Sequence, residues 1–329
     1  MKSSSSFFRS LTLGGLIGLL TLGGSASVSI AQTYPDRAIK IIVPTGPGGG
    51  YDVYGRLLGD ELSRRINQSV VVENKTGAGT VVGTQAAIAA PNDGYTLLVG
   101  GLSNIIFNQN LYRKAPYDAM KSLIPVAINY KNTYMVVTAP NSPFKTMKDV
   151  IAAAKAKPNG LNLATPGQGT GQQLAAVAFM KSVGIQLQEV PYRGATAVYP
   201  DLLSGRVDVF FDSDTGALPF VKSGHARALA ITSATRSKEA PDVPTMAEAG
   251  IPGLEMTAWI GIFAPAGTPQ HIIEQLQKAI AASEKELQPK FAAIGGEYIH
   301  VEAGKLSSFV TSEYNQWARI IKDSDIKLD

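Results

Sequence analysis

Two glycine-rich turns stand directly before helix-like segments and hold the residues with the clearest chemical potential. The first is Gly46-Pro47-Gly48-Gly49-Gly50, and the second is Gly167-Gln168-Gly169-Thr170-Gly171. A glycine turn that feeds a helix leaves backbone N–H groups unpaired at the positive end of the helix dipole. Such a site suits a carboxylate, phosphate or sulfate, and glycine lets the anion approach the backbone closely. Each turn alone also has an ordinary explanation, as a tight strand-to-helix connection for the first and as a helix cap for the second.

Polar residues at the starts of the two helices add to this pattern. Asp52 is placed to cap the first helix or to accept a hydrogen bond from a ligand. Thr170 and Gln173 have the spacing of a capping box, in which each side chain bonds the other residue's backbone N–H. We expect the amides of Gly169, Thr170 and Gly171 to stay free for an anion.

Neither turn has the sequence of a nucleotide site. A phosphate-binding P-loop ends in Gly-Lys-Ser/Thr, whereas these turns continue as Gly-Tyr-Asp and Gly-Gln-Gln. The first turn also lacks the Rossmann glycine spacing, and Glu73 only loosely matches the acidic partner of that motif. Since neither nucleotide-binding motif is present, we predict no cofactor.

The turns belong to two units with the same order of elements, which predicts an α/β fold. In the first unit, a strand over 38–45 precedes the turn, a helix with Leu58 and Leu62 on one face follows it, and strands come at 70–73 and 95–99. In the second unit, strands at 161–164, 186–190 and 207–211 surround a helix that follows the second turn. The matching order predicts two lobes whose turns face each other.

The boundary between the lobes is expected near 130–138, where a strand-like run leads into a Pro-Asn-Ser-Pro segment. A strand at 228–231 closes the second unit, and helices at 269–286 and 307–321 end the chain. We predict a signal peptide over residues 1–31, a first lobe of residues 32–132 and 255–329, and a second lobe of residues 133–254.

The amino-acid composition is typical of a folded chain, and it allows no disulfides. The 329 residues are 45% apolar and 17% charged, contain no cysteine, and carry a net charge of +4. An apolar fraction of this size supports a large core. The absence of long runs of like charge argues against a nucleic-acid partner. Without cysteine, disulfides and thiolate metal sites are excluded.

The first thirty-one residues have the layout of a secretory signal peptide. Lys2 and Arg9 precede the uncharged, leucine-rich stretch Leu11–Leu22, and Ser29-Ile30-Ala31 offers small residues before a cleavage site. The alternative is a transmembrane anchor, but the strongly apolar part is shorter than the ~20 residues that span a bilayer. We therefore expect a soluble periplasmic protein.

Motifs along the chain resemble the tripartite tricarboxylate transporter receptors, the Bug-type periplasmic solute-binding proteins. The resemblance covers the chain after the signal segment, and the motifs occur in the family's order: Tyr34-Pro35-Asp36-Arg37, Pro47-Gly48-Gly49-Gly50, Val71-Val72-Glu73-Asn74-Lys75, Gly77-Ala78-Gly79, Asp93-Gly94-Tyr95-Thr96-Leu97-Leu98, Val190-Pro191-Tyr192-Arg193-Gly194, Asp242-Val243-Pro244-Thr245 and Phe263-Ala264-Pro265-Ala266-Gly267-Thr268-Pro269.

The resemblance implies a two-lobed type II periplasmic-binding-protein fold that closes on a small carboxylate. It implies a monomer that delivers its ligand to integral-membrane transporter subunits and has no enzymatic activity. The positions that match the family's ligand-binding residues, together with their neighbours in the two loops, are Pro47, Gly48, Gly49, Gly50, Tyr51, Asp52, Ser103, Gln168, Gly169, Thr170, Gly171, Gln172, Tyr192 and Asp212. Arg193 is a further candidate on chemical grounds, as the partner of a second ligand carboxylate, and a solvated arginine is the alternative. Tyr51 and the second loop depart from the family's usual residues, which leaves the identity of the carboxylate open.

Two other functions stay open at the level of the sequence. One is a ligand-sensing receptor that serves a signalling partner. The other is a Mg²⁺-dependent phosphatase, because Asp212 and Asp214 follow an apolar strand in the Asp-x-Asp arrangement of a phosphoryl-transfer nucleophile. The three histidines are far apart in the sequence, so no metal site is predicted.

Overall fold

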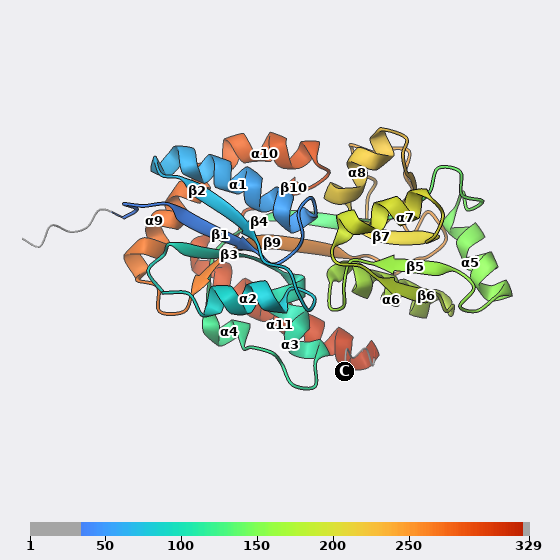
Figure 1. Ribbon diagram of the computed structural model, residues 1–329, viewed down its shortest axis with the longest axis horizontal. Helices are drawn as coiled ribbons and strands as arrows, with labels where there is room; N and C mark the ends of the chain where they lie inside the picture. The colour runs from blue at the N-terminus through green and yellow to red at the C-terminus, as the bar shows by residue number, and fades with distance from the viewer. Residues whose placement is uncertain (1–33, 325–329) are drawn as a thin grey trace, which may run out of the picture. The chain divides into compact units, whose positions relative to one another are not determined.

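The computed structural model describes residues 34–324, and the predicted signal peptide lies outside the described residues. Within residues 34–324, no helix combines the length and apolar character needed to cross a bilayer. The strands follow the order β2-β1-β3-β9-β4-β7-β5-β6, with β10 and β8 pairing separately with β4. Figure 1 shows this arrangement of strands with helices packed on both faces.

The first half of the chain forms a parallel β–α unit. Strand β1 (Ile39–Val43) pairs in parallel with β2 (Val70–Asn74) and β3 (Thr96–Gly101). Helices α1 (Gly50–Ile66) and α2 (Val81–Ile88) connect these strands. In α1, Leu58 and Leu62 are completely buried, as their spacing predicts, and such burial contributes about 1.5–3 kcal/mol per side chain.

A similar unit follows in the second half. Strand β5 (Asn162–Thr165) pairs in parallel with β6 (Gln188–Pro191) and β7 (Val209–Ser213), and helix α6 (Gly171–Val183) follows the second glycine turn. The predicted strands are therefore present within a few residues of their predicted ranges. The helix α8 (Asp214–Lys222), which was not predicted, begins directly after β7.

Two long strands connect the halves. Strand β4 (Leu123–Thr138) pairs antiparallel with β9 (Thr257–Pro265) up to Thr133, and from Tyr134 onward it pairs antiparallel with β7 and β8 (Arg227–Ile231). Repeated strand–helix–strand order favours parallel pairing, and both units have it. Strands β4 and β9 are instead antiparallel, because the chain leaves the first lobe along β4 and returns to it along β9.

The C-terminal helices pack on the first half. The predicted helix over 269–286 is two helices, α9 (Gln270–Ala281) and α10 (Glu284–Ala293), and both contact α1. Helix α11 (Leu306–Ser324) lies against β4 on the side of the strands away from α10 (Figure 1). The aromatic rings of Tyr54, Tyr130 and Phe291 pack together between α1, β4 and α10.

The remaining elements are short connections. They are the π-helix η1 (Leu102–Phe107), helices α3 (Asn108–Leu111), α4 (Ala119–Ser122), α5 (Met147–Ala156) and α7 (Tyr199–Leu203), the 3₁₀ turns η2 (Ala195–Val198) and η3 (Ala303–Lys305), and strand β10 (Glu297–Tyr298).

Candidate functional site

A cavity of about 350 Å³ lies where the loops of the two halves meet the connecting strands. Loops that follow β1, β2, β3, β5 and β6 contribute to it, which is the edge of a parallel sheet where α/β proteins bind ligands. It is lined by Pro44, Thr45, Gly46, Gly49, Gly50, Tyr51, Thr76, Gly77, Ala78, Gly79, Thr80, Leu102, Ser103, Asn132, Tyr134, Pro166, Gly167, Thr170, Gln172, Tyr192, Arg193, Gly194, Ala195, Ser213, Ala258 and Ile260.

The structure brings about half of the predicted site residues to this cavity. Those that line it are Gly49, Gly50, Tyr51, Ser103, Thr170, Gln172, Tyr192 and Arg193. Those that do not line it are Pro47, Gly48, Asp52, Gln168, Gly169, Gly171 and Asp212. The second group belongs to the same loops and strand ends, where its members hold the lining residues in position.

The first glycine loop presents the N-terminus of α1 to the cavity. Gly49 is the N-cap residue, has extended backbone angles, and has no side chain to cap the helix. The first amides of the helix, those of Gly50 and Tyr51, therefore start it without a side-chain cap, and both residues line the cavity. An uncapped helix start carries positive partial charge, so this end of the cavity suits an anion.

Asp52 supports this loop from outside the cavity. Its carboxylate accepts hydrogen bonds from the Gly48 amide at 2.9 Å and from Asn74 Nδ2 at 2.8 Å, and it pairs with Arg56. Burial opposes ionisation of Asp52, but the hydrogen bonds from Arg56, Gly48 and Asn74 outweigh this and lower its pKa. Asp52 thus shapes the loop, and its carboxylate oxygens are already bonded within the chain.

The second glycine loop differs from the sequence prediction. Thr170 Oγ1 accepts from the Gln173 amide, but Gln173 Oε1 accepts from the Gly169 amide at 2.8 Å. The Gly171 amide donates to Ser103 Oγ at 3.0 Å. The amides of Gly169 and Gly171, expected to be free for an anion, are therefore used inside the protein. Gln173 reaches one residue further back than predicted and takes the first, and Ser103 takes the second.

A third loop, residues 76–80, lines the cavity and was not assigned to the site from the sequence. Ala78, Gly79 and Thr80 have positive φ angles of 43°, 55° and 85°. A Cβ atom on Gly79 would lie 1.8 Å from the Gln168 carbonyl oxygen, so only glycine permits this approach of the two loops. The Gly77-Ala78-Gly79 motif was the available signal, but its place beside the second glycine loop depends on the tertiary fold.

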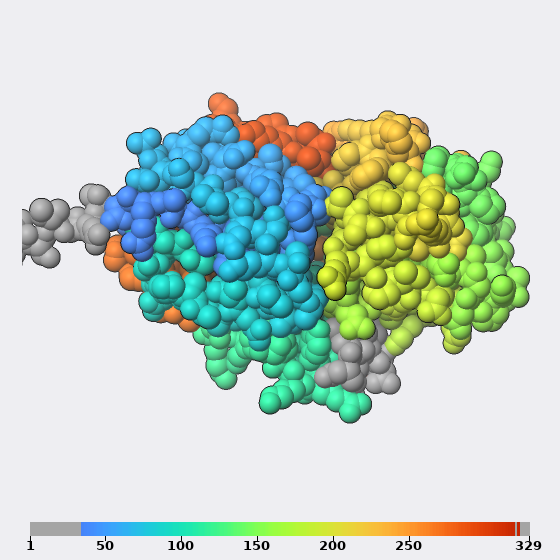
Figure 2. Space-filling view, viewed as in Figure 1, coloured from blue at the N-terminus to red at the C-terminus, as the bar shows by residue number. Residues whose placement is uncertain are grey.

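Hydrogen bonds join the two halves across the cavity. Thr196 Oγ1 donates to the Pro47 carbonyl oxygen at 2.7 Å, and Ser103 receives the Gly171 amide. In Figure 2 the blue N-terminal surface meets the yellow surface of the second half directly. The structure therefore represents a closed arrangement of the loops.

The wall formed by the connecting strands is polar and aromatic. Tyr134 of β4 is buried and Tyr51, at the start of α1, is half-buried; desolvation raises the pKa of both hydroxyls far above neutral pH, so both remain protonated. The Asn132 Oδ1 and Thr45 Oγ1 atoms are buried and have no hydrogen-bond partner among the described residues. Both residues line the cavity, where a ligand can supply the missing partners.

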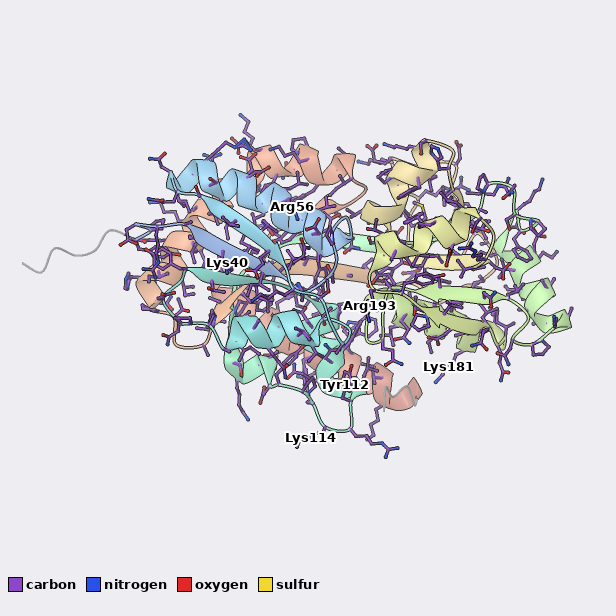
Figure 3. All side chains as sticks on the ribbon, in the orientation of Figure 1. Lys40, Arg56, Tyr112, Lys114, Lys181 and Arg193 are labelled. Carbon is purple, nitrogen blue, oxygen red and sulfur yellow. The ribbon has the colours of Figure 1, made fainter. Side chains whose placement is uncertain are left out.

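Among residues 34–324, Arg193 is the one cavity-lining residue with a formal charge at neutral pH. Its side chain is exposed and lies at the junction of the two halves (Figure 3). The neighbouring Tyr192 donates its hydroxyl to Asp201 at 2.7 Å, which leaves only its ring available to the cavity. The described lining residues therefore give the cavity one positive charge and no negative one.

Asp212 is fully buried behind the cavity and bonds to the chain itself. It accepts hydrogen bonds from the Tyr199 hydroxyl and from the Ser213 amide, both at 2.8 Å. Burial raises the pKa of Asp212 to about 6, and these hydrogen bonds counter part of that rise. Its proposed contact with the ligand stays a prediction.

Asp214 is also buried, with its pKa raised by burial to about 8, and it accepts from the Thr133 amide at 3.2 Å. The two carboxyl groups are therefore not arranged as an open phosphatase centre. In residues 34–324, no group of three or more metal-binding side chains is assembled.

The chain is similar in sequence to a known protein family. Residues 54–326 match the family model described as the tripartite tricarboxylate transporter family receptor. BugT of Bordetella pertussis is 35% identical over 315 residues, covering 95% of this chain and 96% of BugT.

Three solved structures are similar over most of the chain. The periplasmic binding protein BugD has a TM-score of 0.84 and 29% identity, covering 89% of this chain and 99% of BugD. R. palustris Rpa4515 with adipate has a TM-score of 0.85 and 29% identity, with the same coverage of 89% and 99%. MatC from Rhodopseudomonas palustris with bound malate has a TM-score of 0.82 and 27% identity, covering 88% of this chain and 100% of MatC.

These matches confirm the two-lobed binding-protein fold and the resemblance inferred from the motifs. They also confirm that the chain is not an enzyme, because the family consists of receptors and the similar structures are binding proteins. This chain is a member of the tripartite tricarboxylate transporter receptor family.

Proposed function

We propose that this chain is a periplasmic receptor that encloses a small carboxylate in the cavity between its lobes and delivers it to the membrane subunits of a transporter. The uncapped start of α1 beside the single cationic side chain, Arg193, is the observation that carries the proposal. A carboxylate suits both groups, since it accepts hydrogen bonds from helix amides and pairs with a guanidinium.

The ligands of related proteins agree with this chemistry. Adipate occupies one of the similar structures and malate another, and both are small carboxylates. The secretory signal predicted over residues 1–31 supports a periplasmic location, and the similar protein BugD is a periplasmic binding protein. Delivery to membrane subunits follows from the family's description as a transporter receptor.

We assign the ligand contacts to the predicted residues that reach the cavity and to three that the sequence did not suggest. The backbone amides of Gly50 and Tyr51 bind the carboxylate, and Arg193 balances its charge. Thr45, Asn132 and Ser213 contact the rest of the ligand. Asp52, Gly48 and Gly169 hold the loops in shape.

In this proposal, ligand binding shifts the population of the chain from open to closed lobes. We take the first lobe as residues 32–132 and 255–329 and the second as 133–254, with β4 and the segment before β9 as the connections. The ligand favours the closed arrangement because only there do the loops of both lobes contact it. The receptor acts as a monomer in this proposal.

A thermal-shift panel tests the proposal. The purified chain is melted with adipate, malate, succinate, citrate, benzoate and a neutral sugar. A bound carboxylate at 100 times its Kd should stabilise the folded chain by about 2.7 kcal/mol. The sugar should leave the melting temperature unchanged.

Two variants connect the panel to the cavity. Arg193→Gln removes the cavity's charge, and we expect affinity for the carboxylate to fall about tenfold, since a charged hydrogen bond contributes about 1.5 kcal/mol or more. Lys181→Gln removes an exposed charge outside the cavity and should leave affinity unchanged. A panel in which no carboxylate raises the melting temperature, or equal effects of the two variants, would contradict the proposal.

A further inference from the structure

The Asn132 side chain holds an unsatisfied acceptor in the wall of the cavity. Asn132 lies in β4 and is 6% exposed. Its Oδ1 atom is buried and has no donor among the described residues. Its Nδ2 atom donates to the backbone carbonyl of Thr133 at 3.3 Å. A buried acceptor without a donor is rare in proteins and indicates either a ligand or a water contact.

The orientation of this amide is fixed by its surroundings. If the amide were rotated, Oδ1 would face the Thr133 carbonyl oxygen and two acceptors would oppose each other. The oxygen therefore points away from the strand backbone, and the site offers a ligand an acceptor.

The neighbouring strand positions direct the side chain toward the ligand cavity. Asn132 stands two residues before Tyr134 and directly opposite Ala258 in the pairing of β4 with β9. Side chains two apart on a strand, and those directly opposite each other, share one face of the sheet. Tyr134 and Ala258 both line the ligand cavity. Asn132 also borders a second cavity, which Lys131, Thr133 and Thr257 line without reaching the first.

The charges of the cavity limit which donor can bind there. An ammonium group would need a carboxylate partner when it is desolvated, but no Asp or Glu of the described part of the chain lines the cavity. Asp212 is buried behind the wall and is bonded to Tyr199 and Ser213. The donor that fits Asn132 Oδ1 is therefore a neutral one, and a hydroxyl group is the simplest.

We propose that this receptor selects hydroxycarboxylates, with the carboxylate at the α1 amides and Arg193 and the ligand hydroxyl donating to Asn132 Oδ1. This inference rests on the proposed function and narrows its ligand class. A carboxylate without the hydroxyl would bury the Asn132 oxygen unpaired, and an amino acid would bury an unpaired ammonium.

Matched ligands test the proposal in the unmodified protein by isothermal titration. The pairs are malate with succinate, citrate with tricarballylate, 4-hydroxybenzoate with benzoate, and 3-hydroxybutyrate with butyrate; in each, the second acid lacks the hydroxyl. In every pair that binds, we expect the hydroxylated acid to bind at least tenfold more tightly. Aspartate should bind more weakly than malate.

Two variants identify the group responsible. Asn132→Leu keeps the branched shape of the side chain but removes the acceptor, so the preference should fall below twofold through weaker binding of the hydroxylated acid. Thr257→Val is the control, because Thr257 borders only the second cavity, and it should keep the full preference. Loss of the preference in Thr257→Val would place the hydroxyl in the second cavity and overturn the proposal.

The results separate the two proposals. Equal affinity of the paired acids in the unmodified protein would overturn the hydroxyl preference and leave the carboxylate receptor standing. Binding of no carboxylate at all would overturn both. The wild-type comparison decides the question even if a variant fails to fold.

Discussion

Single residues of the site divide into those that face the ligand and those that hold the loops. Asp52 shows the second role, since its oxygens bond the Gly48 amide, Asn74 and Arg56. A sequence pattern places an aspartate near a glycine loop, but it cannot tell whether the carboxylate points into the cavity or back at the loop. Local hydrogen bonding decides that, and here it favours the loop.

The two buried carboxyl groups give stability a dependence on pH. Burial raises the pKa of Asp212 to about 6 and that of Asp214 to about 8, from 3.8 for an unburied aspartate. The folded chain therefore holds these protons more tightly than the unfolded chain does. Their contribution to stability is complete below pH 3.8 and is lost as pH rises through 6 for Asp212 and 8 for Asp214.

Asp214→Asn should remove the upper part of this dependence. In the unmodified chain we expect the free energy of unfolding, measured with urea, to fall as the pH rises from about 6 to 9. In Asp214→Asn this fall should be smaller, because the amide has no proton to lose. Asp60→Asn, at an exposed site on α1, is the control and should retain the wild-type dependence. An unchanged slope in Asp214→Asn would contradict the assignment.

At the scale of elements, the strands of the parallel units were predictable and the connecting strands were not. The runs at β1 and β3 are short and apolar because these inner strands are largely buried. Strand β2 is equally apolar at its start, although it lies at the edge of the sheet and Val71 is exposed. Strand β4 carries Pro125, Lys131 and Asn132 among its apolar residues, since it crosses from one lobe to the other beside the cavity. Only the Tyr134–Val137 end has the pattern of a buried strand, and that is the part the sequence predicted.

For the helices and the loops too, the sequence predicts what local residues determine and misses what the tertiary fold brings together. The break between α9 and α10 falls at Ser283, the N-cap residue of α10. No glycine marks the end of α9, and the available signal was the Ser283–Glu286 spacing of a helix start. The glycine turns were recognisable because strand, glycine and helix follow one another locally. The contributions of Asn132, Tyr134 and Thr76 were not, because they come to the cavity through the tertiary fold.

Loop 76–80 approaches the second glycine loop so closely that Gly79→Ala should weaken ligand binding. The added Cβ atom would collide with the Gln168 carbonyl, so the loops must separate and the closed arrangement is disfavoured. We expect at least tenfold weaker carboxylate binding, measured by titration calorimetry, with a smaller effect on melting without ligand. Gly184→Ala is the matched control: its φ is also positive, at 66°, but its Cβ would meet no atom within 4 Å. Equal losses of affinity in the two variants would show that the collision is irrelevant.

At the scale of the whole molecule, two similar β–α units and the strands between them enclose the ligand cavity, where Arg193 is the charged residue among the described lining residues. The units position loops from both sides, and in the proposed function β4 and β9 supply the wall that distinguishes one carboxylate from another. Contacts such as Thr196 with Pro47 join the lobes only when the loops approach. Capture of the ligand and closure of the lobes are thus one event in this account.

The most direct test is titration calorimetry of the mature chain with malate and with malamide, its uncharged diamide. The two share a carbon skeleton and a hydroxyl group, and they differ in the charged oxygens that the α1 amides and Arg193 are expected to bind. We predict that malate binds at a single site per chain and that malamide binds at least a hundredfold more weakly. Equal binding of the two, or no binding of malate together with no binding of any other carboxylate, would contradict the account.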